Sequence, residues 1–304
     1  MNITALIPPR AWGFKGETHL YGIAKAMERG HAVSYLGSGD VVERPSDFPI
    51  PDLVFMSDPR EKESSWWKVA HYKCPKVVVF GDTWHDYANH VYWAADQGIR
   101  FIAVRARGDI PKIQSMLGSS AKAFWLPYAF LPEVFNSLST VAEQKICDVA
   151  QFGHLGWPYP VRERAREVLS WQTEFVYRDA MVAGDQETSL RGEAYAKALS
   201  SARIVVEAGG HLNWLVSKHF EIPACGALLL ANQGTAHGFQ EIFEDGKTCR
   251  LFRDDCSDLL DVIRETLACP AMSAAIAGRG YNLVHHEHTE YNRLATLLKE
   301  VGLG

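Results

Sequence analysis

The first segment whose residue types point to chemistry is Pro8–His19, which lies between a predicted strand and a predicted helix and contains Gly13 and Gly16. Glycine permits a tight turn and close approach of the backbone to a ligand, and the N–H groups at the start of a helix attract anions. The segment therefore predicts an anion-binding turn, although an ordinary glycine loop explains the same pattern. It has neither the dinucleotide-binding glycine pattern nor the Gly-Lys-Ser/Thr sequence of a P-loop.

A second segment with the same order of strand, glycine turn and helix is Asp148–Arg164. His154 lies in its turn, and Arg162 and Arg164 lie in the first turns of the predicted helix. Arginine is unfavourable near the positive end of a helix dipole, and a bound phosphate would offset that cost. The segment predicts a second anion-binding turn, with a solvated arginine face as the other explanation.

The third segment, Asn213–Leu230, is the most informative of the three. It predicts a helix that ends near Pro223 and is followed by a buried strand, with Lys218 and Glu221 three residues apart on one face. An ionised Glu offers two acceptor oxygens, which suit the two hydroxyl groups of a ribose. The other explanation is an ordinary surface ion pair, worth a few tenths of a kcal/mol.

Acid–base candidates of the first half follow the predicted strand 76–80. Asp82 and His85 would lie at the carboxyl edge of a sheet, where ligands bind, and a neighbouring carboxylate orients an imidazole and raises its basicity. We therefore predict His85 or Asp82 as the catalytic group, with a purely structural histidine as the other explanation. The histidines within 285–288 predict no metal site, because neighbouring histidines on a helix do not converge on one ion.

The elements that must position these residues are short apolar runs that alternate with amphipathic stretches, the pattern of parallel strands joined by crossover helices. Strands are predicted at 2–7, 32–36, 51–56, 76–80, 100–104, 122–126, 147–152, 174–178, 202–206, 227–231 and 248–252. Helices are predicted at 17–29, 111–117, 160–170, 190–200, 213–222, 255–267, after 270 and at 290–301.

The series of strands restarts at Cys147, after the turn-rich stretch 127–144. We therefore predict an α/β protein of two Rossmann-like, doubly wound domains, 1–135 and 145–304, that face a central cleft. The final helix, 290–301, packs either on its own domain or back on the first one. Nucleotide-type ligands are the default for the carboxyl ends of such sheets.

Composition narrows the classes of protein further. The chain of 304 residues has 36 acidic and 31 basic side chains and a net charge of −5, so it lacks a global positive field for nucleic acid or anionic lipid. No apolar run approaches the roughly 18–20 residues of a membrane span, and no signal peptide is evident, so we predict a cytoplasmic protein. Six cysteines without two-residue spacing predict free thiols.

The order of these motifs resembles group-1 glycosyltransferases of the GT-B fold, the family 4-like enzymes. Gly13–His19 and the following Arg29–Val33 are similar to the N-terminal glycine loop, first helix and second strand of that group. Asp148–Arg164 and Lys218–Gly226 resemble the donor-binding domain of the subgroup related to spore-maturation glycosyltransferases. The resemblance covers most of 147–300 and about the first 35 residues.

The resemblance implies a role for several residues. Glu221 takes the place of the second acid in the family's Glu-(seven residues)-Glu motif, which holds the nucleotide ribose, and Asn213 replaces the first acid, which usually contacts the donor sugar. His154 stands where the family often has an arginine that faces the diphosphate, so phosphate binding is shared by His154, Lys218 and helix N-terminal amides. Gly16 faces the phosphates from the other domain.

These features predict a glycosyltransferase that moves a hexosyl or pentosyl group from a UDP- or GDP-sugar to an unidentified acceptor, with retention favoured. The donor is its substrate, and no further cofactor or metal is predicted. The acceptor is a glycan, a protein, a small molecule or, as a minority view, DNA. A nucleotide-sugar epimerase and a non-catalytic nucleotide- or glycan-binding module remain as rival functions, and the oligomeric state stays open.

Overall fold

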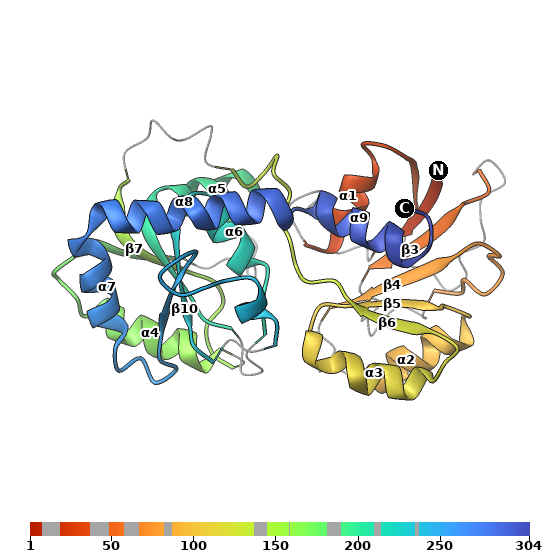
Figure 1. The fold of residues 1–304 in the computed structure, drawn as a ribbon, viewed down its shortest axis with the longest axis horizontal. Helices are drawn as coiled ribbons and strands as arrows, with labels where there is room; N and C mark the ends of the chain where they lie inside the picture. The colour runs from red at the N-terminus through yellow and green to blue at the C-terminus, as the bar shows by residue number, and fades with distance from the viewer. Residues whose placement is uncertain are drawn as a thin grey trace. The chain divides into compact units, whose positions relative to one another are not determined.

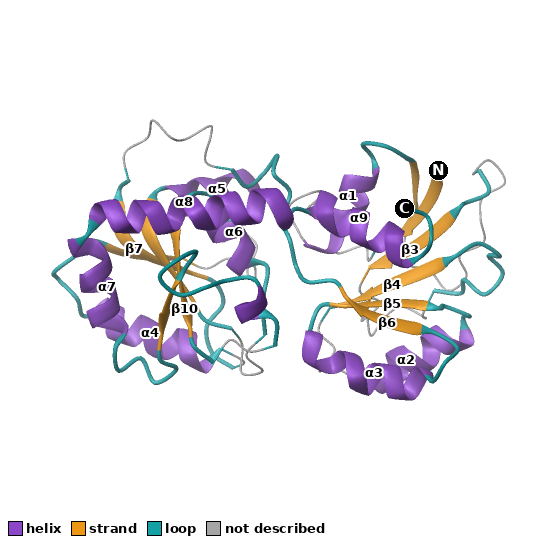
Figure 2. Ribbon diagram, viewed as in Figure 1, coloured by secondary structure: helices purple, strands orange, loops and turns teal. Residues whose placement is uncertain are grey.

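Two parallel sheets organise the chain, and each is built from strands that alternate with helices (Figures 1 and 2). The computed structural model describes residues 1–7, 19–36, 49–57, 67–81, 87–136, 145–157, 159–180, 190–209, 214–234 and 237–304. The described residues divide into two compact units: Met1–Pro127 with Glu290–Gly304, and Tyr128–Thr289. The two parallel α/β sheets confirm the predicted fold class.

The first unit holds a six-stranded sheet of order β2-β1-β3-β4-β5-β6. Its strands are β1 (Asn2–Leu6), β2 (Ala32–Leu36), β3 (Leu53–Ser57), β4 (Lys76–Phe80), β5 (Phe101–Val104) and β6 (Lys122–Trp125). Its helices are α1 (His19–Met27), α2 (Tyr87–Asp96), α3 (Ile110–Leu117) and α9 (Glu290–Glu300), with a 3-10 turn at Arg107–Asp109. Every residue of β3 and β4 is buried, as expected for parallel strands covered on both faces.

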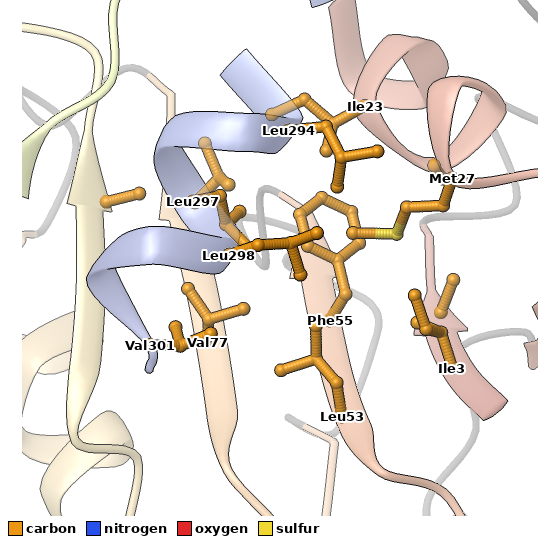
Figure 3. Close-up of a cluster of buried hydrophobic side chains, with 14 of the residues drawn as sticks. Ile3, Ile23, Met27, Leu53, Phe55, Val77, Leu294, Leu297, Leu298 and Val301 are labelled. Atoms are coloured by element: carbon orange, nitrogen blue, oxygen red, sulfur yellow. The ribbon is translucent and has the colours of Figure 1, made fainter. Parts of the chain in front are cut away.

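One face of this sheet is covered by α1 and α9 and the other by α2 and α3. Figure 3 shows the first of these cores, in which Leu294, Leu297 and Leu298 of α9 lie against Ile23 of α1 and Phe55 of β3. The opposite core joins the alternate residues of the same strands to α2 and α3. The last helix of the chain is therefore part of the core of the first unit.

The second unit holds a five-stranded sheet of order β11-β10-β9-β7-β8. Its strands are β7 (Cys147–Phe152), β8 (Tyr177–Ala180), β9 (Ala202–Glu207), β10 (Leu228–Asn232) and β11 (Arg250–Phe252). Its helices are α4 (Pro160–Ser170), α5 (Gly192–Ser200), α6 (Lys218–Ala224), α7 (Leu259–Ala268) and α8 (Pro270–Glu287), with a 3-10 turn at Phe239–Glu241. Apolar residues of α4, α7 and α8 pack on one face of the sheet.

The chain passes between the units at Pro127, which begins the turn-rich stretch 127–144 predicted as the boundary, and again at Glu290. The predicted domain limits of 135 and 145 lie further along that stretch. Residues after Pro127 belong to the second unit because their aromatic side chains pack there. Phe130 contacts His285 edge-on at a centroid distance of 5.0 Å, and Phe135 contacts Tyr195 at 6.0 Å. Turn-forming residues alone did not reveal this packing.

Two further predictions concern thiols and membranes. All six cysteines are free, which agrees with the thiols predicted from their spacing. None of the helices within the described residues combines the length and the apolar character needed to cross a membrane.

Candidate functional site

The candidate site lies where the strand order of the second sheet reverses, between β7 and β9. From β7 the chain continues to β8 on one side, and the next strand, β9, pairs with β7 on its other side. Open α/β sheets bind ligands outside the carboxyl ends of the strands at such a point, because the connecting loops diverge there. Gly153 follows β7 and Glu207 ends β9, so both lie at this edge.

Gly153 is required at this edge for two reasons. Its φ of +132° is a backbone conformation that side chains with a Cβ rarely adopt. A Cβ placed on it would lie 3.1 Å from Nη1 of Arg162 and 3.2 Å from Cε of Lys218. Two basic side chains thus lie directly against the glycine turn, one from α4 and one from α6.

The guanidinium of Arg162 is enclosed by protein, with 1% of the residue exposed. Nη2 forms an ion pair with Oε1 of Glu207 and donates to the Ala208 carbonyl at 3.0 Å, and Nη1 donates to the His154 carbonyl at 2.9 Å. The guanidinium also lies 4.0 Å from the centre of the Tyr159 ring. These bonds join the turn after β7 to the end of β9.

Lys218 begins α6 and is half-buried. Its ammonium makes no hydrogen bond or ion pair with any residue that the structure describes. Burial lowers the pKa of Lys218, Glu207 and Glu221 oppose that change, and Arg162 adds to it. A partly desolvated cation with which no described residue pairs is suited to attract an anion.

Glu221 lies three residues after Lys218, so the two side chains occupy neighbouring positions on the surface of α6. Its carboxylate also acts on Tyr195 of α5, a residue that is 3% exposed. Burial is the main cause that raises the pKa of Tyr195, and the carboxylates of Glu221 and Glu207 add to it. The charges of Glu207 and Glu221 therefore both act on the Tyr195 hydroxyl at this edge of the sheet.

His219 is fully buried on the other side of α6, and burial lowers its pKa to about 4. Its Nδ1 accepts a hydrogen bond from the Val216 N–H at 3.0 Å, and its ring meets Phe239 edge-on at 5.5 Å. The imidazole is consequently neutral at physiological pH and fixes the entry of the chain into α6.

A second set of hydrogen bonds holds the neighbouring loops of the same edge. Oδ1 of Asp254, which follows β11, accepts from Asn232 Nδ2 at 3.0 Å and from the Gly234 N–H at 2.7 Å. Oδ1 of Asn232 accepts from the Gly209 N–H at 3.1 Å. The ends of β9, β10 and β11 are thereby fixed relative to one another.

The predicted site residues divide into two groups. Four of them, Gly16, Asp82, His85 and Asn213, lie outside the residues that the structure describes, so their predicted roles stay predictions. The other four, His154, Arg162, Lys218 and Glu221, lie at the carboxyl edge of the second sheet or on α6 beside it. His154 has an exposed side chain, and its carbonyl is the group that Arg162 holds.

Sequence analysis missed Glu207 and Tyr195. The signal for Glu207 was present, because a charged residue directly follows the apolar run of β9 at the edge where ligands bind. Tyr195 gave no comparable signal, since a tyrosine on the buried face of a helix is ordinary core composition.

The histidines of 285–288 have structural contacts. Nε2 of His285 lies 3.0 Å from the Ala224 carbonyl and its ring lies 4.1 Å from that of Tyr281, while His288 packs on Phe220 at 5.4 Å. Within the described part of the chain, no group of three or more His, Cys, Asp or Glu side chains is placed to hold a metal ion.

A cavity of about 370 Å³ lies at the opposite, amino edge of the second sheet. Lys145 lines it, but its ammonium donates to the carbonyls of Ser200 at 2.8 Å, Ala202 at 2.9 Å and Gly226 at 3.3 Å. The donors of Lys145 are thus used within the protein, and Nε of Arg203, which also lines the cavity, lies 3.3 Å from a carboxylate oxygen of Asp148.

Two parallel α/β units in one chain, together with the similarity to solved structures of the same fold, define the GT-B class of protein. The sequence matches the glycosyl transferase-like family over residues 138–299, more than half of the chain. The chain therefore belongs to that family, and its family and fold are those of glycosyltransferases. A search of curated protein sequences gave no significant match.

Solved structures share the fold over the whole chain at low sequence identity. A sucrose-phosphate synthase from Thermosynechococcus elongatus superposes with a TM-score of 0.68 at 10% identity, covering 98% of each chain. HepE of Anabaena, in complex with UDP and glucose, gives 0.63 at 10% identity and 99% coverage of each chain. A glycosyltransferase from Rickettsia africae gives 0.61 at 11% identity, covering 99% of this chain and 97% of that one. At these identities the similarity shows the fold alone.

Proposed function

We propose that this protein transfers a sugar from a nucleoside-diphosphate sugar to an acceptor, and that the second unit binds the donor with UDP as its nucleotide. The observation that carries the proposal is the half-buried ammonium of Lys218, which lies against the Gly153 turn at the switch point of the sheet without a partner among the described residues. A diphosphate is an anion of suitable charge for that position. HepE, which shares the fold, has been solved with UDP and with UDP-glucose.

In this proposal Lys218 and the backbone amides of the Gly153–His154 turn contact the diphosphate. Glu221 accepts hydrogen bonds from the two ribose hydroxyls, since a carboxylate offers two acceptor oxygens. His154, with its exposed side chain beside the turn, adds a further donor to the phosphates. Arg162 acts from behind the turn, because its Nη1 and Nη2 groups donate to protein oxygens.

The chemistry follows from the leaving group. Cleavage of the bond between sugar and diphosphate develops negative charge on the phosphate oxygens and positive charge on the sugar ring. A fixed cation next to the phosphate stabilises the transition state more than the ground state, since that charge grows as the bond breaks. Lys218 is positioned to supply this cation. The proposal has three further parts. The reaction retains the configuration of the sugar, Asn213 contacts the donor sugar, and Asp82 or His85 acts on the acceptor.

Titration of the protein with UDP, GDP and ADP by isothermal calorimetry tests the donor site. We expect UDP to bind, and Lys218→Met to weaken its binding about ten- to 100-fold, because a hydrogen bond to a charged group contributes about 1.5–3 kcal/mol. Glu221→Gln should weaken the binding of UDP but leave the binding of inorganic diphosphate unchanged. The matched control is Lys247→Met, which removes an exposed lysine of the same unit that pairs with Glu244 at 2.8 Å.

Turnover is tested by incubating the protein with UDP-glucose and a panel of glycan and peptide acceptors, with UDP release as the readout. No binding of any nucleotide to the wild-type protein would overturn the proposal. Nucleotide binding without UDP release from any donor would favour the non-catalytic module, and conversion of the sugar without an acceptor would favour an epimerase.

A further inference from the structure

The last residue of β9, Glu207, is a buried acid that has no role in the proposed contacts with the donor. Glu207 is 0% exposed, and a carboxylate is stable in such a place only when other groups compensate its charge. Oε1 is paired with Arg162, whereas Oε2 makes no hydrogen bond with any described residue. Arg162 therefore pairs with only one of the two carboxylate oxygens of Glu207, and the negative charge on the other oxygen is left without a direct partner among the described residues.

The direct partner of Glu207 is held from several sides. Besides Glu207, the Arg162 guanidinium binds the carbonyls of His154 and Ala208 and stacks on the Tyr159 ring. The Arg162 carbonyl in turn accepts from Gln151 Nε2 at 2.6 Å. Because the guanidinium is planar and its donors are fixed in direction, a shift of one partner displaces the others.

The same charge acts on Lys218. Among the described residues, three charged groups affect its ammonium: Glu207 from β9, Arg162 from α4 and Glu221 from α6 itself. Arg162, which like Lys218 lies against Gly153, disfavours a second positive charge there, and burial does so more strongly. The two carboxylates work in the opposite direction, and of these Glu207 has the larger effect.

We propose that Glu207 is a positioning residue of the donor site: it holds Arg162, which fixes the Gly153–His154 turn, and it balances the charge of Lys218. The proposal rests on the donor site described under the proposed function. Glu207 touches neither the sugar nor the phosphates. It acts through Arg162 and Lys218, so its loss should change both the strength and the pH dependence of diphosphate binding.

The test is calorimetric titration with UDP between pH 7 and pH 9.5 on wild-type protein, Glu207→Gln and a matched control. We expect Glu207→Gln to weaken UDP binding about tenfold or more at pH 7. We also expect its affinity to decline at a lower pH than in wild type, because Lys218 loses the larger of two negative charges that oppose the lowering of its pKa. A residue that only supports the fold would not shift this alkaline limit.

The control is Glu174→Gln, the same change at an exposed residue of the same unit, which pairs with Arg264 at 2.8 and 2.9 Å. It should leave the affinity and its pH dependence unchanged. A second variant, Arg162→Met with Glu207→Leu, removes the buried pair as a whole, which proteins tolerate better than the loss of one partner. It should fold and also bind UDP at least tenfold more weakly.

The outcomes separate this inference from the proposed function. If wild-type protein binds no nucleotide, the proposed function fails and the inference fails with it. If wild-type protein binds UDP, and a folded variant lacking the Glu207 carboxylate binds it with unchanged affinity and unchanged pH dependence, the inference alone is overturned. Should Glu207→Gln not fold, the double variant decides by its affinity.

Discussion

Two glycines of α8 should respond in opposite directions to the same substitution. A Cβ on Gly280 would lie 2.6 Å from the backbone oxygen of Thr248, whereas a Cβ on Gly278 would have none of the described residues outside its own helix turn within 4 Å. Gly280 is buried and Gly278 is exposed, only two residues away on the same helix. Substituting these two glycines by alanine therefore separates the effect of helix propensity on stability from the effect of packing.

The magnitudes follow from these distances. Alanine is better than glycine inside a helix by about 0.5–1 kcal/mol, and this gain applies at both positions. At Gly280 the contact would have to lengthen by about 0.8 Å to reach the 3.4 Å of ordinary van der Waals contact. The opposing carbonyl belongs to a hydrogen-bonded turn: the Thr248 N–H donates to the Glu244 carbonyl at 2.9 Å, and Arg279 donates to the adjacent Lys247 carbonyl at 2.7 Å. Overpacking of this kind costs about 1–3 kcal/mol.

We therefore expect Gly278→Ala to stabilise the protein by about 0.5–1 kcal/mol and Gly280→Ala to destabilise it by about 1–2 kcal/mol. Urea denaturation followed by circular dichroism measures both free energies of unfolding, and unchanged slopes show that the unfolding transition is the same. If Gly280→Ala proves as stable as Gly278→Ala, then α8 does not pack on the Thr248 segment as described, and the reasoning is refuted.

Three further predictions concern other parts of the chain. Leu297→Ala should destabilise the first unit by about 2–5 kcal/mol in urea denaturation, while Thr296→Ala, an exposed neighbour, should change stability by less than about 0.5 kcal/mol; equal effects would contradict the packing of α9. The pKa of His219 is about 4 in the folded state and about 6.5 in the unfolded chain, so its contribution to stability is complete above pH 6.5 and is lost as the pH falls toward 4. His219→Gln should accordingly show a smaller loss of stability than wild type over that range of pH, and an identical loss would exclude a buried neutral imidazole. A thiol reagent should modify exposed Cys269 in the native protein but reach Cys225, which is fully buried, only after unfolding, as mass spectrometry of labelled peptides can show.

The fold was largely predictable because parallel strands covered on both faces are continuous apolar runs. The run Lys76–Phe80 was predicted as a strand with its observed limits, and Arg250–Phe252 lies within the predicted 248–252. Helix α2 (Tyr87–Asp96) was not among the predicted helices. The predicted first domain extended to 135, past the crossing at Pro127, because contacts such as Phe135 with Tyr195 join residues far apart in the sequence.

The site was predictable only in part. Glycine turns and the spacing of Lys218 and Glu221 are local signals, and the sequence pattern carries them. The pairing of Arg162 with Glu207 joins residues that lie 45 positions apart and requires the register of β7 and β9, which no local pattern specifies. Arg162 was therefore predicted as a direct phosphate contact, whereas in the structure its Nη1 and Nη2 groups donate to protein oxygens.

The position of α9 in the first unit has a consequence for how the chain is made. Translation produces α9 after every residue of the second unit, although Leu294, Leu297 and Leu298 belong to the core of the first. On the ribosome, one apolar face of the first sheet therefore stays incompletely covered until α9 has been synthesised. By then all residues of the second unit have already been synthesised. We therefore expect the second unit to fold before the first unit is complete. Until α9 packs, the apolar face of the first sheet that it covers is the kind of exposed hydrophobic surface to which chaperones bind.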